Sequence, residues 1–196
     1  MAVSKLWSIN ESGLSSVLQY AANPKKTNNK LYISGINCEP ETAYEEFTAV
    51  KRSYAKADGI EAYHGYLSFK EQNITPELTM KIGTEFAQEV WGKRFQILVT
   101  VHTDTEHPHC HFVINSVSFV DGKKLWGEEK AWFKFKQTAD RLCEKYGLYY
   151  NPKPVRGRSS SYHYNREKKG EPTRYLLARE AMEKALLQCT NTADLR

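Results

Sequence analysis

Several stretches of the chain carry apolar residues at helical spacing. Leu14, Val17, Leu18 and Ala21 lie at positions i, i+3, i+4 and i+7, and an Asn-Pro pair follows them. This spacing predicts a helix over 12–22 that buries one face and stops at the proline. The same criteria predict further helices at 41–57, 75–91, 130–147 and 173–188.

Other stretches are typical of β-strands. The apolar and β-branched runs at 94–102 and 109–119 are the strongest, and only six residues join them. A parallel pair needs a long crossover connection, so these two strands are predicted to be antiparallel neighbours. Shorter strands are predicted at 30–37 and 62–69. Strands and helices in this irregular order favour an α+β fold with a central antiparallel sheet flanked by helices.

Composition narrows the class of protein. The 196 residues are 40% hydrophobic and 26% charged, which suits one sizeable domain with a core of its own. No apolar run reaches the roughly 20 residues of a membrane span, and residues 1–10 lack the apolar core of a signal peptide. The four cysteines are scattered without a CxxC pair, so we expect reduced thiols in a cytoplasmic protein.

Charge is distributed unevenly along the chain. Residues 1–150 are neutral, whereas 151–196 hold ten Lys/Arg against five Asp/Glu. We therefore expect a folded core over 1–150, a basic flexible segment over 151–172, and a C-terminal helix of the same domain over 173–196. Basic residues interleaved with tyrosines suit a nucleic-acid backbone with stacked bases, although a solvated linker has the same composition. The candidate DNA contacts there are Arg156, Arg158, Tyr162, Tyr164, Arg166, Lys168 and Lys169.

Four of the six histidines lie within ten residues, in the sequence VHTDTEHPHCHFVIN. Side chains alternate along a strand, so His109 and His111 share one face, and His102 ends the preceding strand. The three imidazoles can therefore meet at one point. Three neutral histidine ligands with open positions are typical of a catalytic metal site, which leaves water activation by zinc as one interpretation. His107 is out of phase with the strand.

Two further candidates come from the predicted elements. Tyr20 lies on the first helix about 110° from the centre of its apolar stripe, so its phenol can project toward a site, and tyrosine can act as a covalent nucleophile. With twelve tyrosines in the chain, a packing role is the alternative. His64 is a possible active-site neighbour or a structural histidine. Lys25 and Lys26 can contact phosphates or serve as ordinary surface charge.

The pattern HxDx(4)HxH, formed here by His102, Asp104, His109 and His111 before FVIN, resembles the third motif of a nuclease family. The family is that of the MobA-type (MOBP) relaxases, or mobilisation nucleases, of conjugative plasmids and integrative conjugative elements, in the HUH endonuclease superfamily. VLQYAANPKKT resembles its first motif, in which a tyrosine on an early helix precedes an Asn-Pro turn. AYHGYLSF and KQTADRLCEKYGL resemble its later elements. The resemblance runs from about Ser4 to Leu187, and it makes 1–150 the nuclease core with the metal site.

The resemblance implies a mechanism. Tyr20 would be the nucleophile, His102, His109 and His111 the metal ligands, and Asp104 a group that orients a histidine or helps to receive the tyrosine proton. The enzyme would be a relaxase that nicks one strand at a transfer origin and keeps a 5′-phosphotyrosine link, which allows rejoining at the end of conjugative transfer. The cofactor would be one divalent ion, Mn²⁺ or Mg²⁺, with Zn²⁺ or Ni²⁺ possible as purified because imidazole favours them.

Partners follow from the same resemblance. We expect single-stranded or hairpin-containing origin DNA, accessory DNA-binding proteins, a conjugation secretion channel, a monomeric state and a bacterial cytoplasmic location. Whether 1–196 is a whole gene product or an excised nuclease domain is left open. The alternatives are a rolling-circle replication initiator or transposase of the same superfamily, a metal-dependent hydrolase without a covalent DNA intermediate, and a DNA-binding module without activity.

Overall fold

The structure is a computed structural model that describes 3–10, 12–71, 73–104, 108–125 and 128–150, and beyond these only residues 166, 169–171, 173, 177–178 and 180–182. The chain divides into two compact units, residues 1–152 and residues 153–196. The second unit is described only in short pieces, in which Arg166 pairs with Glu171 at 2.7 Å. Within the described residues, no helix is long and apolar enough to cross a membrane.

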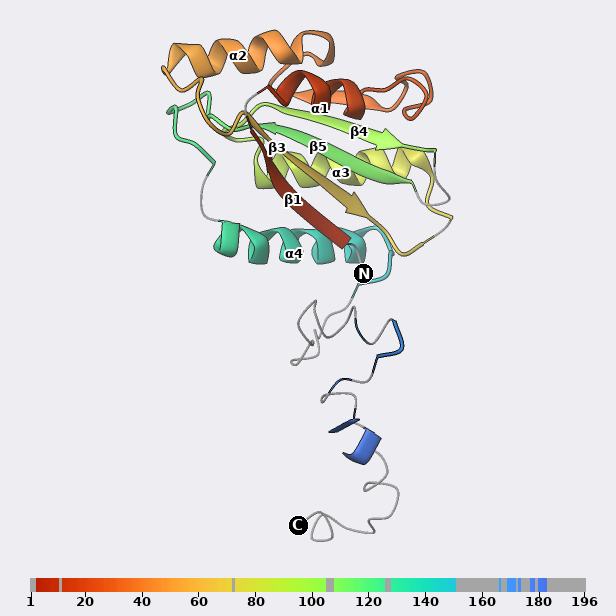
Figure 1. The fold of residues 1–196 in the computed structure, drawn as a ribbon. Helices are drawn as coiled ribbons and strands as arrows, with labels where there is room; N and C mark the ends of the chain where they lie inside the picture. Colours follow the sequence, from red (N-terminus) through yellow and green to blue (C-terminus); the bar gives the residue numbers. More distant parts are fainter. Residues whose placement is uncertain are drawn as a thin grey trace. The chain divides into compact units, whose positions relative to one another are not determined.

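The first unit is built on a five-stranded, fully antiparallel sheet (Figure 1). The strand order is β1-β3-β5-β4-β2, so β5 is central and β1 and β2 form the edges. The strands are β1 (Val3–Ile9), β2 (Ile33–Ile36), β3 (Ala62–Ser68), β4 (Ile97–His102) and β5 (His109–Asn115).

Four α-helices cover the sheet, α1 and α2 on one face and α3 and α4 on the other (Figure 1). A short 3-10 turn, Pro40–Thr42, leads into α2. Thr75 caps α3 by accepting a hydrogen bond from the backbone N–H of Leu78 at 3.2 Å, as expected for threonine before Pro76. The helices are α1 (Leu14–Ala21), α2 (Ala43–Ser53), α3 (Pro76–Val90) and α4 (Glu128–Lys145).

The α+β class with a central antiparallel sheet is confirmed, but strand β1 was not predicted. Its sequence VSKLWSI has lysine and serine among its apolar residues, because an edge strand pairs on one side only and keeps part of its surface in water. All four predicted strands were also too long, and the reason can be given for the two strongest. β4 begins at Ile97 because Arg94 and Phe95 bond back to the carbonyl of Trp91, and β5 ends at Asn115, before the turn at Gly122.

The register of the central strands brings the histidines together. β4 and β5 pair so that His102 faces His109 and Thr100 faces His111, while β3 places Tyr66 beside His111. Residues directly opposite each other in an antiparallel pair point to the same face. All three histidines therefore project from the face that carries α1, and the predicted placement of His109 and His111 on one face is confirmed.

Close packing under β5 holds this register. Cys110, between the two histidines of β5, is fully buried against α3, and its thiol lies 3.0 Å from the carbonyl oxygen of Thr79. A Cβ on Gly83 would lie 2.2 Å from the sulfur of Cys110, so only glycine lets α3 approach this closely. The strand segment that presents His109 and His111 is consequently packed directly against α3.

Candidate metal centre and nucleophile

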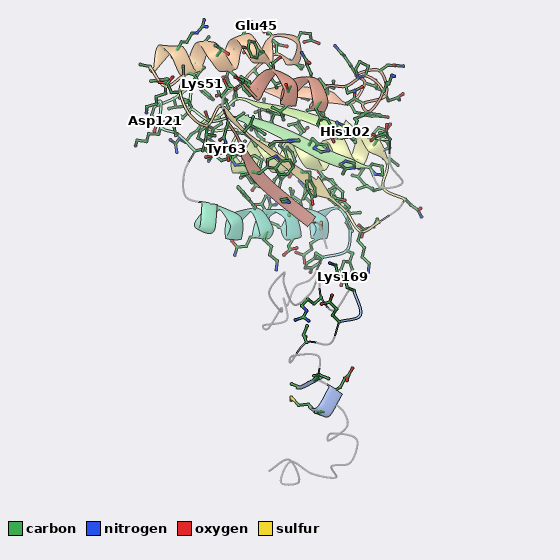
Figure 2. The ribbon with its side chains drawn as sticks, viewed as in Figure 1. Glu45, Lys51, Tyr63, His102, Asp121 and Lys169 are labelled. Atoms are coloured by element: carbon green, nitrogen blue, oxygen red, sulfur yellow. The ribbon has the colours of Figure 1, made fainter. Side chains whose placement is uncertain are left out.

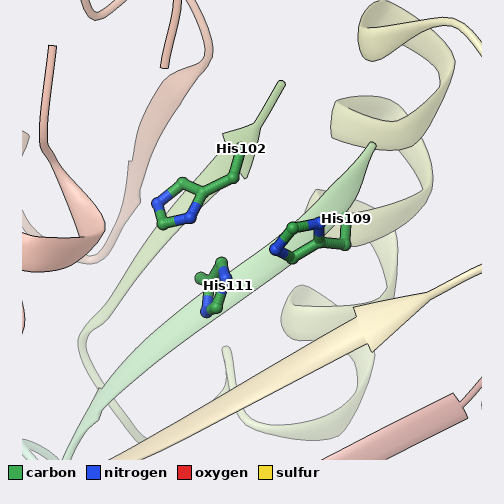
Figure 3. Close-up of side chains that lie close together, drawn as sticks. All are labelled: His102, His109 and His111. Atoms are coloured by element: carbon green, nitrogen blue, oxygen red, sulfur yellow. The ribbon is translucent and has the colours of Figure 1, made fainter. Parts of the chain in front are cut away.

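The side chains of His102, His109 and His111 converge at one end of the sheet (Figure 3). His102 comes from the last residue of β4, and the other two come from the first and third residues of β5. One ring nitrogen from each histidine lies within 4.8 Å of the others. Two nitrogens bonded to one ion at about 2.1 Å are at most about 4.2 Å apart, so small ring rotations bring all three within reach of a single cation.

Two of these histidines have a buried ring nitrogen with no hydrogen-bond partner among the described residues, Nδ1 of His102 and Nε2 of His111. A buried polar atom without a partner costs free energy, and it is a reason to look for a ligand. The opposite nitrogen of each ring is satisfied, by the carbonyl of Ala21 and by His64 respectively. The residues therefore fit a divalent metal ion bound through three imidazoles.

In two of the three rings, the partner of one nitrogen determines that the other nitrogen faces the centre. His102 donates its Nε2–H to the carbonyl oxygen of Ala21 at 3.0 Å. His111 Nδ1 lies 3.0 Å from Nε2 of His64, so a metal on the far nitrogen of His111 makes Nδ1–H the donor and His64 the acceptor. Outer partners of this kind orient metal-bound histidines and raise their basicity.

Burial favours the neutral form of His64, His102 and His111. It lowers the pKa of His111 to about 2, with the neighbouring histidines adding to the effect, and it lowers the pKa of His64 to about 4. Burial also lowers the pKa of His102 below its ordinary value, although the hydrogen bond to Ala21 opposes the shift. Neutral imidazole is the form that binds a metal ion.

Tyr20 stands directly over this cluster. Its ring centroid lies 5.4 Å from that of His102, 5.8 Å from that of His111 and 5.9 Å from that of His64, each in an edge-to-face arrangement. The side chain is 44% exposed, whereas the apolar positions of α1 are buried. The helix thus presents the phenol to solvent at the metal centre and does not use it for packing.

Lys26 links Tyr20 to Asp104. Its ammonium nitrogen lies 4.5 Å from the centre of the Tyr20 ring and 3.4 Å from a carboxylate oxygen of Asp104. Burial lowers the pKa of Lys26, but the Tyr20 and Asp104 oxygens outweigh it and hold the pKa above its ordinary value. A positively charged ammonium therefore lies beside the phenol. The Asp104 carboxylate pairs with this lysine, and its charge also opposes the lowering of the His102 pKa by burial.

Helix α1 is anchored at both ends. At its start, Gly13 has no side chain to cap the helix, and a carboxylate oxygen of Glu61 accepts the backbone N–H of Leu14 at 2.9 Å. A carboxylate at a helix N-terminus is favourable to the helix dipole. The buried ammonium of Lys51 donates a hydrogen bond to the backbone carbonyl of Glu61 at 3.3 Å. Lys51 lies toward the opposite end of the sheet from His102 (Figure 2). At the other end, Ala21 bonds to His102.

The remaining predicted site residues separate into three groups. His64 is buried and contacts His111, so it is a direct neighbour of the centre. Lys25 is exposed on the turn after α1, and Arg166 and Lys169 belong to the second unit. The others lie outside the described residues: Arg156, Arg158, Tyr162, Tyr164 and Lys168. His107, which is out of phase with the strand and was not predicted as a ligand, also lies outside them.

The sequence did not predict two of the contacts that organise the centre. The Ala21 carbonyl is a backbone group and has no sequence signature. The role of Glu61 was also missed, although a glycine at the helix start and an acid before β3 offered a signal. Lys26 was predicted only as a possible phosphate contact, and its place between Tyr20 and Asp104 emerges from the structure.

Comparison with known proteins identifies the chain. Residues 20–148 match the family model described as "Relaxase: MobA/VirD2-like, nuclease domain". The matched stretch runs from Tyr20 through all three histidines to the end of α4. The chain belongs to this relaxase family.

Curated relatives agree with the family. This relaxase chain is 36% identical over 148 residues to a "Protein rlx" of Staphylococcus aureus, a match that covers 76% of the chain and 44% of the relative. It is 25% identical over 179 residues to the "Group II intron-interrupted relaxase LtrB" of Lactococcus lactis, covering 70% of the chain and 31% of that protein. The chain therefore spans less than half the length of these curated relatives.

Two solved structures share the fold. One is the MobM relaxase domain (MOBV) bound to plasmid pMV158 oriT DNA in a Mn-bound crystal structure, with a TM-score of 0.55, 12% identity, and coverage of 84% of this chain and 98% of that one. The other comes from "Molecular Basis of Vancomycin Resistance Transfer in Staphylococcus aureus", with a TM-score of 0.53, 13% identity, and coverage of 82% and 100%. At these identities the likeness supports the fold alone.

Proposed function

We propose that this relaxase domain nicks one strand of a transfer origin by attack of Tyr20 on a phosphodiester, and that it keeps the cut strand as a 5′-phosphotyrosine adduct. The observation that carries the proposal is the position of the Tyr20 ring, whose centre lies within 6 Å of the rings of His102 and His111, two of the proposed metal ligands, and of His64. A nucleophile and a metal centre in direct contact are the two parts that such a reaction needs.

Tyr20, Asp104 and Lys26 each have a separate role in the proposed reaction. The Oη atom of Tyr20 forms a bond to phosphorus while the bond to the 3′-oxygen breaks, and the strand upstream leaves with a 3′-hydroxyl. Asp104 helps to receive the phenolic proton, and its ion pair with Lys26 holds the carboxylate on the side of the Tyr20 ring where the ammonium lies. The ammonium of Lys26 stabilises negative charge on the phenolic oxygen and on the phosphate.

His102, His109 and His111 would hold one divalent ion, and the ion supplies neutralisation of the charge that develops on the phosphate oxygens. Mn²⁺ or Mg²⁺ is the proposed working ion; the MobM relaxase domain, which has a similar fold, was solved with Mn bound. His64 and the Ala21 carbonyl hold two of the ligand rings so that the correct nitrogens face the centre. The reaction conserves the energy of the phosphodiester bond, so the same residues can rejoin the strand without ATP.

The proposed substrate is single-stranded or hairpin-containing origin DNA. The MobM relaxase domain was solved bound to oriT DNA, and Lys26 supplies positive charge beside the Tyr20 ring here. Lys25, Lys26 and the basic residues of 151–170 are the proposed contacts to the backbone. Accessory DNA-binding proteins, a secretion channel, a monomeric state and a cytoplasmic location remain part of the same proposal.

A denaturing gel tests the function directly. Single-stranded oligonucleotides that together span the DNA flanking the gene are labelled at the 3′ end in one set and at the 5′ end in another. With Mn²⁺ or Mg²⁺ present, the 3′ label should move with the protein after denaturation, and the 5′-labelled fragment should be released with an end that a DNA polymerase extends. Free fragments without any covalent adduct would indicate a metal-dependent hydrolase instead.

A further inference from the structure

An exposed tryptophan extends the face of the sheet beyond the metal centre. Trp7 lies on the edge strand β1 directly opposite His64, so it projects from the face that carries the three histidines. Its side chain is 36% exposed. The neighbouring residue of the strand, Leu6, points to the other face and packs against the larger core cluster, whereas Trp7 belongs to neither core cluster.

The surroundings of Trp7 are aromatic and basic. Its ring lies 4.6 Å from the ring of His64 and 6.2 Å from that of Tyr66, both edge to face. The ammonium of Lys5 lies 5.8 Å from the centre of the Trp7 ring. Lys5 and Tyr66 are opposite each other in the β1–β3 register, so all of these side chains share one surface.

This surface is continuous with the metal centre. His64 contacts Trp7 on one side and lies 5.1 Å, ring centre to ring centre, from His111 on the other. Tyr66 likewise lies 6.4 Å from His111. A strand whose phosphate sits at the histidines therefore needs to extend only one or two nucleotides to place a base on Trp7.

We propose that Trp7, flanked by Tyr66 and Lys5, is the stacking platform for a nucleobase one or two nucleotides from the phosphate that Tyr20 attacks. The inference rests on the proposed function for the location of that phosphate. A tryptophan face is suited to stacking on any base, and a lysine beside it is suited to the adjoining phosphate. Stacking anchors the strand at a fixed distance from the metal centre, which sets which phosphate lies under Tyr20.

A nucleobase explains the surface better than a protein partner does. The exposed aromatic area is one ring beside a cation and a polar histidine centre, not a broad apolar patch of the kind that protein interfaces bury. The face lies next to the site where a polyanion is processed, and its charged group is a lysine, which complements a phosphate.

Photo-cross-linking tests contact without reference to the origin sequence. A single-stranded oligothymidine of about 20 nucleotides, long enough to span several stacking sites, carries 5-iodouracil at one position, and the protein carries Tyr20→Phe so that no adduct forms. Trypsin releases residues 6–25 as one peptide that holds both Trp7 and position 20. Fragment ions should place the link at Trp7. A link confined to other peptides, or no binding of this probe at low salt, would overturn the platform.

Binding measurements separate stacking from structural support. In the Tyr20→Phe background, Trp7→Ala should weaken oligothymidine binding by about 5- to 150-fold, the range expected for removal of one base stack, and Trp7→Phe should restore most of it. The salt dependence should keep its slope in Trp7→Ala, whereas Lys5→Ser should reduce the slope by about one phosphate contact. The matched control is Tyr44→Ala on α2, where the side chain is 47% exposed, and it should bind normally.

Two further readouts decide between the remaining explanations. If Trp7 only holds His64 in place, Trp7→Ala will bind Mn²⁺ more weakly in calorimetry and will be less stable to heat. Its binding of DNA without metal will be unchanged. This result would overturn the proposal. If the proposed function is wrong, the result is different: the parent protein forms no covalent adduct with origin-flanking DNA, but the cross-link to Trp7 still appears.

Discussion

His102 Nε2 lies 3.0 Å from the carbonyl oxygen of Ala21, the residue that follows Tyr20. This single bond joins the last turn of the helix that carries the proposed nucleophile to a histidine of the metal centre. It leaves Nδ1 of His102 as the nitrogen that faces the other two histidines. The positions of the phenol and of the three imidazoles are therefore set together, which is the kind of preorganisation that in-line attack on a phosphate requires.

The ligand histidines should separate catalysis from DNA binding. His109→Ala and His111→Ala should each abolish nicking, because two remaining imidazoles do not hold the ion in place. The affinity for an oligonucleotide should stay within about threefold of the parent value, because phosphate contacts from lysines supply most of it. A gel-shift assay measures binding and a denaturing gel measures nicking. Full nicking by either variant, or by the parent in excess chelator, would remove the metal from the mechanism.

His64 should act through His111. His64→Ala removes the acceptor for His111 Nδ1–H and should weaken Mn²⁺ binding by about 10- to 100-fold, the usual cost of losing an outer partner of a metal ligand. His64→Gln places an amide oxygen near the position of the lost ring nitrogen and serves as the matched control, with binding close to that of the parent. Calorimetry with Mn²⁺ measures both. Equal loss in the two variants would mean that the bond to His111 is not what His64 provides.

The buried imidazoles should make the metal-free domain sensitive to acid. Unfolded histidine has a pKa of about 6.5, whereas the folded pKa is about 4 for His64 and about 2 for His111. Below about pH 6.5 the unfolded state binds protons that the folded state does not. The free energy of unfolding therefore has the full contribution of these neutral rings above this pH, and it loses that contribution as the pH falls toward the folded pKa values.

Each such histidine costs on the order of 2 kcal/mol of unfolding free energy between about pH 7 and about pH 5. Urea unfolding of the chelator-treated protein at these two values measures the loss, and the double variant His64→Gln/His111→Gln should lose much less over the same interval. A parent protein that is equally stable at both values would show that these rings are not buried and neutral in the folded state.

The basic segment should contribute affinity without sequence preference. Replacing the six Lys and Arg residues of 153–169 with Ser should weaken single-stranded DNA binding and reduce the slope of log affinity against log salt by about one for each phosphate that is no longer bound. The metal site should stay occupied, as Mn²⁺ calorimetry would show. Unchanged binding at moderate salt would make the segment a linker, with the DNA held by the sheet and the lysines near Tyr20.

Sequence patterns predicted the centre well where side chains follow the period of an element. Strand alternation placed His109 and His111 on one face, and the six-residue connection placed His102 beside them. The angle of Tyr20 on its helix predicted a residue that points away from the core, and the ring is indeed exposed above the histidines. These inferences use geometry that is local to one or two elements.

Contacts that depend on tertiary structure could not be predicted from the sequence. Strand β1 alternates poorly because it is an edge strand, so neither it nor the exposed Trp7 was predicted. The bond between His102 and Ala21 involves a carbonyl that every residue has, and the pairing of Lys26 with Asp104 joins residues 78 positions apart. Only the folded chain determines which of many lysines and carbonyls lie next to the centre.

The identity of the attacking residue is the central claim, and peptide mapping of a trapped adduct tests it most directly. The parent protein is incubated with origin-flanking single-stranded DNA and Mn²⁺, the adduct is digested with nuclease and trypsin, and the modified peptide is sequenced by mass spectrometry. We predict a 5′-phosphonucleotide on Tyr20 within the tryptic peptide 6–25, and we predict that Tyr20→Phe binds the same DNA yet forms no adduct. A phosphotyrosine at another position, or a link through a histidine such as His64, would contradict the assignment.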